Sequence, residues 1–297
     1  MRIHHLNCVS TCPLGGHLMD GSARSMLERG KLTCHCLLLE TDADGLVLID
    51  TGFGLRDVHA PRTRLSGFFL ALVKPEFREE MTAIRQIERM GFDPRDVRHI
   101  VMSHLDFDHA GGLDDFPWAT VHLLADEQHN AMAQRTWMDR QRFRPQQWSC
   151  RDRWIAYRDE GERWFGFAQA QSLRGLRPEI LLVPLIGHTL GHAGIAVRCA
   201  GRWHLLAADA YFYFAEMDPH PRCTPGLRFY QWMLEKDRRA RLENQQRLRA
   251  LRADHGNDVE VFCSHDVSEF ERLAGRPAGI PAERLVDAGS QWASGHR

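Results

Sequence analysis

The sequence, 297 residues long, predicts an α/β fold in which strands and helices alternate in mixed layers. Apolar runs at 33–40 and 46–49 are separated by Asp42-Ala43-Asp44-Gly45, whose residues tolerate the positive φ of a tight turn, so the two runs form a β-hairpin. Residues 77–90 carry apolar side chains at helical spacing and end at Gly91, and a strand at 98–103 follows. This alternation packs helices against sheets.

The rest of the chain continues the pattern, with a long helix over about 227–252 and further strands at 120–124, 180–185, 194–199, 203–207 and 259–263. Two stretches, 55–78 and 131–175, fit the alternation poorly, and the second is rich in tryptophan and arginine. We interpret both as insertions near the active site of a single domain spanning residues 1–297.

Composition excludes some classes of partner. Apolar residues make up 43% of the chain, charged residues 26%, and the formal net charge is -1, so nothing attracts the protein in bulk to nucleic acid or acidic membranes. The N-terminus lacks the basic and apolar segments of a secretory signal, and no long apolar stretch follows. We expect a cytoplasmic protein that acts on a small molecule. The oligomeric state stays open, with a homodimer as one option.

The strongest chemical signal is the segment 103–112, Ser-His-Leu-Asp-Phe-Asp-His-Ala-Gly-Gly, at the end of a predicted strand. Along an extended segment His104, Asp106 and Asp108 point to one side, and a turn at the following glycines brings His109 inward. Imidazole and carboxylate together suit zinc, iron or manganese, and the lack of a thiolate in the segment argues against a closed structural zinc site.

Other candidate ligands also follow predicted strands, where an α/β scaffold gathers functional groups that are distant in sequence. They are His188 and His192 in Gly-His-Thr-Leu-Gly-His, Asp209 after 203–207, and His265 after 259–263. Asp50, which precedes Thr51-Gly52, is either a supporting carboxylate or the cap of a turn. The dense motif and its partners together predict a metal centre.

These motifs, in this order, resemble the metallo-β-lactamase superfamily and, more narrowly, its N-acyl homoserine lactonase-like branch. The resemblance covers about residues 30–268 and implies an αββα sandwich of two mixed sheets flanked by helices. It also implies two divalent metal ions, zinc first. One would be held by His104, Asp106 and His192, the other by Asp108, His109 and His265, with Asp209 as the bridge and Asp50 and His188 as supporting residues.

Asp106 departs from the pattern, because most members carry histidine at this position. A carboxylate is a harder donor than imidazole, so the substitution favours iron or manganese more than an all-histidine site does.

The resemblance implies hydrolysis of a lactone or ester by a hydroxide that bridges the two metals, with Asp108 passing a proton to the leaving oxygen. Known lactonases carry a tyrosine shortly after the bridging aspartate. Here Tyr211 or Tyr213 could serve, although Phe212 takes the expected place.

The predicted substrate is a lactone or ester with an apolar chain, an N-acyl homoserine lactone first, because aromatic residues crowd both insertions. Alternatives within the class are a β-lactamase, a thioesterase, an organophosphate hydrolase and a phosphodiesterase. An alternative outside it is a non-catalytic metal-binding protein whose site has eroded at Asp106.

Overall fold

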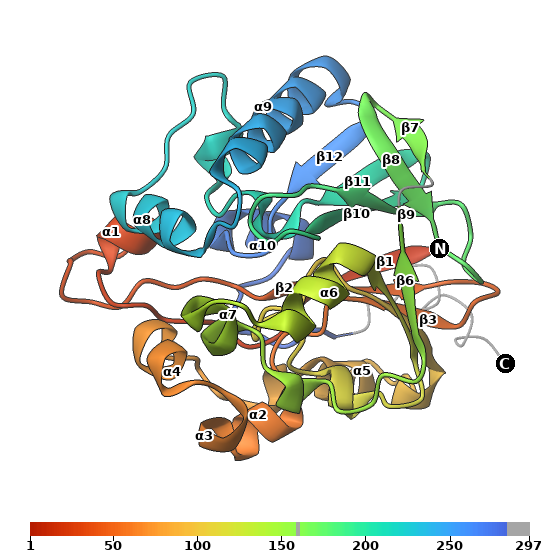
Figure 1. Cartoon of the computed structure of the whole chain (residues 1–297), viewed down its shortest axis with the longest axis horizontal. Helices are drawn as coiled ribbons and strands as arrows, with labels where there is room; N and C mark the ends of the chain where they lie inside the picture. The colour runs from red at the N-terminus through yellow and green to blue at the C-terminus, as the bar shows by residue number, and fades with distance from the viewer. Residues whose placement is uncertain (159–160, 284–297) are drawn as a thin grey trace, which may run out of the picture.

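The computed structural model describes residues 1–158 and 161–283, and within them two mixed six-stranded sheets pack face to face with helices outside (Figure 1). The expected αββα sandwich is confirmed. The first sheet runs β1 (Arg2–Asn7), β2 (His35–Glu40), β3 (Leu46–Ile49), β4 (Val97–Val101), β5 (Thr120–Leu124), β6 (Trp154–Tyr157). The second runs β12 (Val259–Phe262), β11 (Arg202–Leu206), β10 (Ala193–Cys199), β9 (Ile180–Pro184), β8 (Phe167–Ser172), β7 (Glu162–Trp164).

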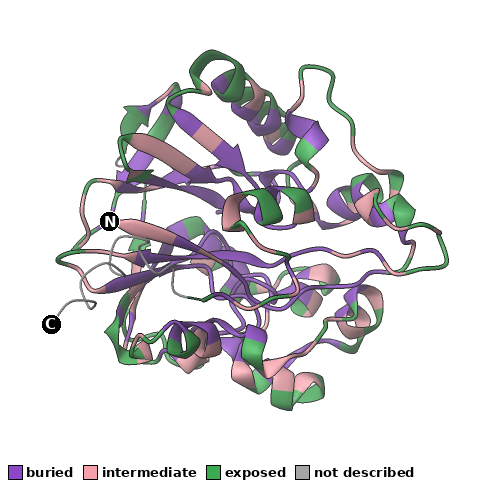
Figure 2. Cartoon of the chain, turned by 180° about the vertical axis from the view of Figure 1, so that it is seen from behind, coloured by how far each residue is buried: buried purple, intermediate pink, exposed green. Residues whose placement is uncertain are grey.

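The helices lie outside the two sheets, and Figure 2 shows exposed residues on their outer faces. They are α1 (His17–Asp20), α2 (Leu55–His59), α3 (Pro61–Arg64), α4 (Gly67–Val73), α5 (Ala83–Arg89), α6 (Ala125–Ala133), α7 (Trp137–Arg142), α8 (Pro225–Leu234), α9 (Arg238–His255) and α10 (Val267–Ala274). Short 3-10 helices are η1 (Glu79–Met81), η2 (Pro94–Asp96), η3 (Leu113–Asp115), η4 (Pro145–Gln147), η5 (Ala208–Ala210) and η6 (Phe214–Met217). In the described part of the chain, no helix is long and apolar enough to cross a membrane.

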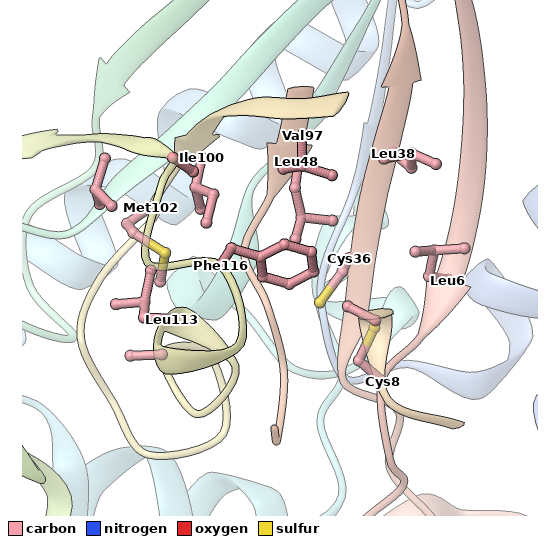
Figure 3. Packing of buried hydrophobic residues seen from close by; sticks show 14 of the residues in the cluster. Leu6, Cys8, Cys36, Leu38, Leu48, Val97, Ile100, Met102, Leu113 and Phe116 are labelled. Carbon is pink, nitrogen blue, oxygen red and sulfur yellow. The ribbon is translucent and has the colours of Figure 1, made fainter. Parts of the chain in front are cut away.

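Strand alternation divides the interior into layers. Along β3, Leu46 and Leu48 face the helices, whereas Val47 and Ile49 face the second sheet. Figure 3 shows the ring of Phe116 among side chains of the first layer, including Leu48 and Cys36. On the outer face of the second sheet, strand residues pack against Leu248 and Leu251 of α9. The central strands are therefore buried on both faces, which explains why β2, β3 and β10 are mostly apolar along their length.

Several sequence-based boundaries change in the structure. The helix predicted at 77–90 begins later, as α5 at Ala83. The predicted long helix is two helices, because the backbone N–H groups of Lys236 and Asp237 both donate to the carbonyl of Gly187 and Asp237 caps α9. The stretch 131–175 contributes β6, β7 and β8 to the sheets and is thus partly scaffold, whereas 55–78 forms α2, α3 and α4.

Candidate metal centre

The candidate residues meet at one edge of the sandwich, where the parallel strands of both sheets end. β3 and β4 run parallel and lead to Asp50 and His104, and β11 and β12 run parallel and lead to Asp209 and His265. Parallel strands bring their carboxyl ends to a common edge, so residues far apart in sequence become neighbours.

Asp209 lies at the centre of the group. One carboxylate oxygen, Oδ1, is 3.1 Å from Nε2 of His109 and 3.1 Å from Nε2 of His265. The other, Oδ2, is 3.7 Å from Nε2 of His104 and 3.3 Å from Nε2 of His188. Burial alone would raise the pKa of Asp209, yet the positive charge that His265 and His109 carry when protonated holds this pKa well below its ordinary value.

Three imidazoles present Nε2 to this group because their other nitrogen is hydrogen-bonded elsewhere. Nδ1 of His109 contacts Asp50 at 2.9 Å, Nδ1 of His265 contacts the Thr33 carbonyl at 2.7 Å, and Nδ1 of His104 contacts the Ser103 hydroxyl at 2.8 Å. A proton held on Nδ1 by an oxygen acceptor leaves Nε2 as the free electron-pair donor, the arrangement common among metal-binding histidines.

Asp50 connects two of these contacts. It accepts hydrogen bonds from the Ser103 backbone at 2.8 Å, from the Ser103 hydroxyl at 2.6 Å and from His109. It is fully buried with a φ of 51°, an unusual backbone for aspartate. The Asp50 carboxylate thus contacts the candidate ligand His109 and the residue before His104.

The structure brings His188 into the group and leaves His192 behind it. Both ring nitrogens of His192 are occupied by the backbone, Nδ1 with the Leu185 carbonyl at 2.9 Å and Nε2 with the Asp209 N–H at 3.0 Å. His188 directs Nε2 at Asp209 and Asp106, and the same nitrogen lies 2.7 Å from Nη2 of Arg142. The loop adopts this shape because Gly187 has a φ of 142° and Gly191 lies against α6, where a Cβ would be 2.0 Å from the Glu127 nitrogen.

Asp106 reaches the group but is also held by Arg142, a residue that the sequence analysis did not single out. Oδ2 of Asp106 lies 3.4 Å from Nε2 of His104 and 2.9 Å from Nε2 of His188. Arg142 donates Nε to Oδ1 at 2.6 Å and Nη2 to Oδ2. Burial opposes ionisation of Asp106, but the Arg142 charge and the His104 contact hold its pKa well below the ordinary value.

Asp108 and His265 form a second cluster of potential ligands together with Cys34, which the sequence analysis did not single out. Oδ2 of Asp108 is 3.9 Å from Nε2 of His265, and the Cys34 sulfur is close enough to both to complete a metal-capable trio. Burial raises the pKa of Asp108. Only the position of Cys34 before a strand could have suggested this proximity.

The donor set fits metal ions. In the described part of the chain, ligand atoms cluster as His104, Asp106, His188 and Asp209, as His109, Asp209 and His265, and as Cys34, Asp108 and His265. Buried atoms facing the group, including Nε2 of His104, Nε2 of His109 and Oδ1 of Asp209, have no hydrogen-bond partner. Buried polar atoms are rarely left unpaired, so these converging electron pairs indicate a place for cations.

The tyrosines after Asp209 do not share one position. Tyr211 points into the core of the second sheet, where its hydroxyl donates to Glu269 at 3.0 Å. Tyr213 is half-buried beside Phe214. Tyr230 of α8 is buried 5.8 Å from the ring of Phe212, and burial, together with the charges of Asp108, Asp106 and Asp209, raises its pKa well above the ordinary value.

A pocket of about 400 Å³ adjoins the group. Phe212 and His265 lie in its wall with their ring centroids 4.8 Å apart, and Leu32, Phe214 and Leu227 add apolar surface. The predicted insertions contribute less than expected. Trp148, Trp154 and Trp164 pack into the layers beside the sheets, and Phe69 packs on Phe107.

Two mixed sheets flanked by helices, with buried histidines and aspartates at the shared edge, define a metallo-hydrolase of the αββα class. The model of the metallo-beta-lactamase superfamily matches residues 29–265, and the chain belongs to this superfamily. A probable metallo-hydrolase of Mycobacterium tuberculosis is 38% identical over 271 residues, which cover 91% of this chain and 82% of that protein. Family membership makes the chain a metal-dependent hydrolase.

More distant relatives include lactonases. An N-acyl homoserine lactonase of Bacillus thuringiensis is 32% identical over 130 residues, 42% of this chain and 52% of that protein. A solved N-acyl homoserine lactone hydrolase, with the product N-hexanoyl-L-homoserine bound at its catalytic metal center, matches with a TM-score of 0.67 and 20% identity over 91% of this chain and 95% of that one. At this identity the structural match shows the fold alone.

Proposed function

We propose that this protein is a hydrolase with two metal ions that opens lactones or cleaves esters, with N-acyl homoserine lactones as the first substrates to test. The observation that supports this most is the position of the Asp209 carboxylate, which lies next to His109 through one oxygen and next to His188 through the other. A partly apolar pocket adjoins these residues. The lactonase relatives support the choice of substrate.

We assign one metal to His104, Asp106 and His188, the other to Asp108, His109 and His265, and the bridge to Asp209. His188 thus replaces His192 in the assignment drawn from sequence. Zinc is the first metal to test, followed by manganese and ferrous iron because of Asp106. Two such ions, when bound, would polarise a carbonyl and provide a nucleophilic water at neutral pH.

The remaining steps belong to side chains of this protein. Asp108, at the edge of the group, would take the proton released on attack and pass it to the leaving oxygen. Tyr230 would donate a hydrogen bond to the developing negative charge, because this buried tyrosine packs on Phe212 and lies close enough to the aspartates of the group for their charges to raise its pKa. In this assignment Tyr230 of α8 stabilises the oxyanion, in place of Tyr211 or Tyr213.

The pocket is suited to an acyl chain. A volume of about 400 Å³ is within the range of small-molecule sites, which are mostly apolar with a few polar groups. Phe212 and His265 line the pocket together and their rings are in contact, so a chain held against Phe212, Phe214 and Leu227 would leave its carbonyl end near His265.

The proposed function is tested with purified protein supplied separately with zinc, manganese and ferrous iron. Ring opening of a lactone releases an acid, so a pH indicator reports turnover of homoserine lactones of increasing acyl length. Parallel assays use a simple ester, a β-lactam, a thioester, a phosphotriester and a phosphodiester. We expect lactones or esters to give the highest kcat/KM, rising with acyl length until the pocket is filled. Clear phosphodiester cleavage without turnover of any lactone or ester would contradict the proposal.

Tyr230→Phe should lower kcat by about 10²-fold, the usual effect of removing one donor to a developing oxyanion, while KM changes little. Tyr211→Phe is the matched control, since its hydroxyl contacts Glu269 instead, and should change stability more than kcat. Steady-state kinetics of the two variants measure the difference. If Tyr211→Phe lost kcat and Tyr230→Phe did not, the assignment to α8 would be wrong.

A further inference from the structure

Arg142 is a fully buried arginine directly beside the candidate metal centre, with a relative exposure of 0%. It is the last residue of α7, and a capping box between Thr136 and Asp139 stabilises the start of this helix. Its guanidinium binds Asp106 through two nitrogens, and Nη1 donates to the carbonyl of Leu234 at the end of α8. A planar guanidinium bound in this way holds a carboxylate in one orientation.

The same guanidinium also contacts the neighbouring ligand. Nη2 lies 2.7 Å from Nε2 of His188, the nitrogen that faces the group. One positive charge is therefore shared by the two side chains assigned to the same metal, and it is shielded from water. A histidine at position 106 would be neutral and would give this arginine no carboxylate to pair with.

We propose that Arg142 is the positioning residue that makes an aspartate usable at position 106, by fixing its carboxylate and cancelling its added charge. With the pair intact, this corner of the group has the net charge of a site built with neutral imidazole. Without the aspartate, the unpaired guanidinium repels a cation at His104 and His188. The inference rests on the proposed metal assignment and extends it to a residue outside the motif.

A consequence is that changing Asp106 toward the histidine usual in the family should weaken the centre. Asp106→His alone is expected to reduce the affinity for the metal at this corner by about 10- to 100-fold, the range seen when partners of metal ligands are lost. In the Arg142→Gln background the same change leaves no buried charge unpaired, so we expect it to reduce the metal affinity by less than about threefold.

The experiment is a double-mutant cycle on the full chain, read by metal binding. Wild type, Asp106→His, Arg142→Gln and the double variant are stripped with chelator, and zinc and manganese are titrated against a chromophoric chelator. Asp106→Asn, alone and with Arg142→Gln, repeats the comparison with a side chain of the same size in case the histidine variant does not fold. Arg64→Gln is the control, because Arg64 is also a buried partner of an aspartate, Asp57, outside the group.

We expect Arg142→Gln to restore most of the metal affinity that Asp106→His or Asp106→Asn removes. Arg64→Gln should bind metal as wild type does. If substitution of Asp106 reduced the metal affinity equally with Arg142 present and with Arg142→Gln, the inference would be overturned while the metal assignment stayed intact. A wild-type protein that binds neither metal would instead overturn the proposed function.

Discussion

Asp209→Asn is expected to lower kcat/KM by at least about 10³-fold while the protein stays folded, because it removes the carboxylate shared by both corners of the metal group. Its oxygens lie 3.1 Å from His109 and His265 and 3.3 Å from His188, so no other side chain can take its place without moving. The backbone N–H of this residue, which bonds His192, is unaffected by the change.

The measurement combines lactone hydrolysis, elemental analysis and circular dichroism of the variant. Asp254→Asn, an exposed aspartate on α9, is the control and should match wild type in all three. Near-wild-type turnover by Asp209→Asn with two metals bound would show that Asp209 is not the bridge.

His188→Gln and His192→Gln should have different effects although the residues are four positions apart in one loop. His188→Gln removes a nitrogen that faces the group, so we expect the loss of about one metal equivalent and about 10²-fold in kcat/KM. His192→Gln removes two buried hydrogen bonds to the backbone, so we expect both metals to remain and Tm to fall by about 5–10 °C.

Metal content and thermal unfolding of the two variants test this directly. The assignment taken from the sequence resemblance predicts the reverse order, with His192 as the ligand. If the His192→Gln variant bound only one metal and kept its thermal stability, His192 would be the ligand, as the sequence resemblance implies.

The sequence by itself determined the elements whose signals are local. The hairpin of β2 and β3 is predicted by two apolar runs on either side of a turn. The motif at 104–109 is recognisable because its potential metal ligands are adjacent in sequence and directly follow a predicted strand. Asp209 and His265 are predicted in the same way, each just after a strand, and the resemblance to the family assigns them to a single site. These inferences need only residues close together in the chain or a known order of motifs.

Tertiary structure decided everything that depends on direction or on distant partners. Local sequence cannot show that both nitrogens of His192 are bound to backbone groups of Leu185 and Asp209, which leaves His188 to face the centre. Nor can it show that Arg142, on a helix within an apparent insertion, reaches Asp106, because that contact joins residues 36 positions apart. The helix break before α9 depends likewise on the carbonyl of Gly187. In each case the deciding energy is that of a buried hydrogen bond or charge, and its partner is known only once the chain has folded.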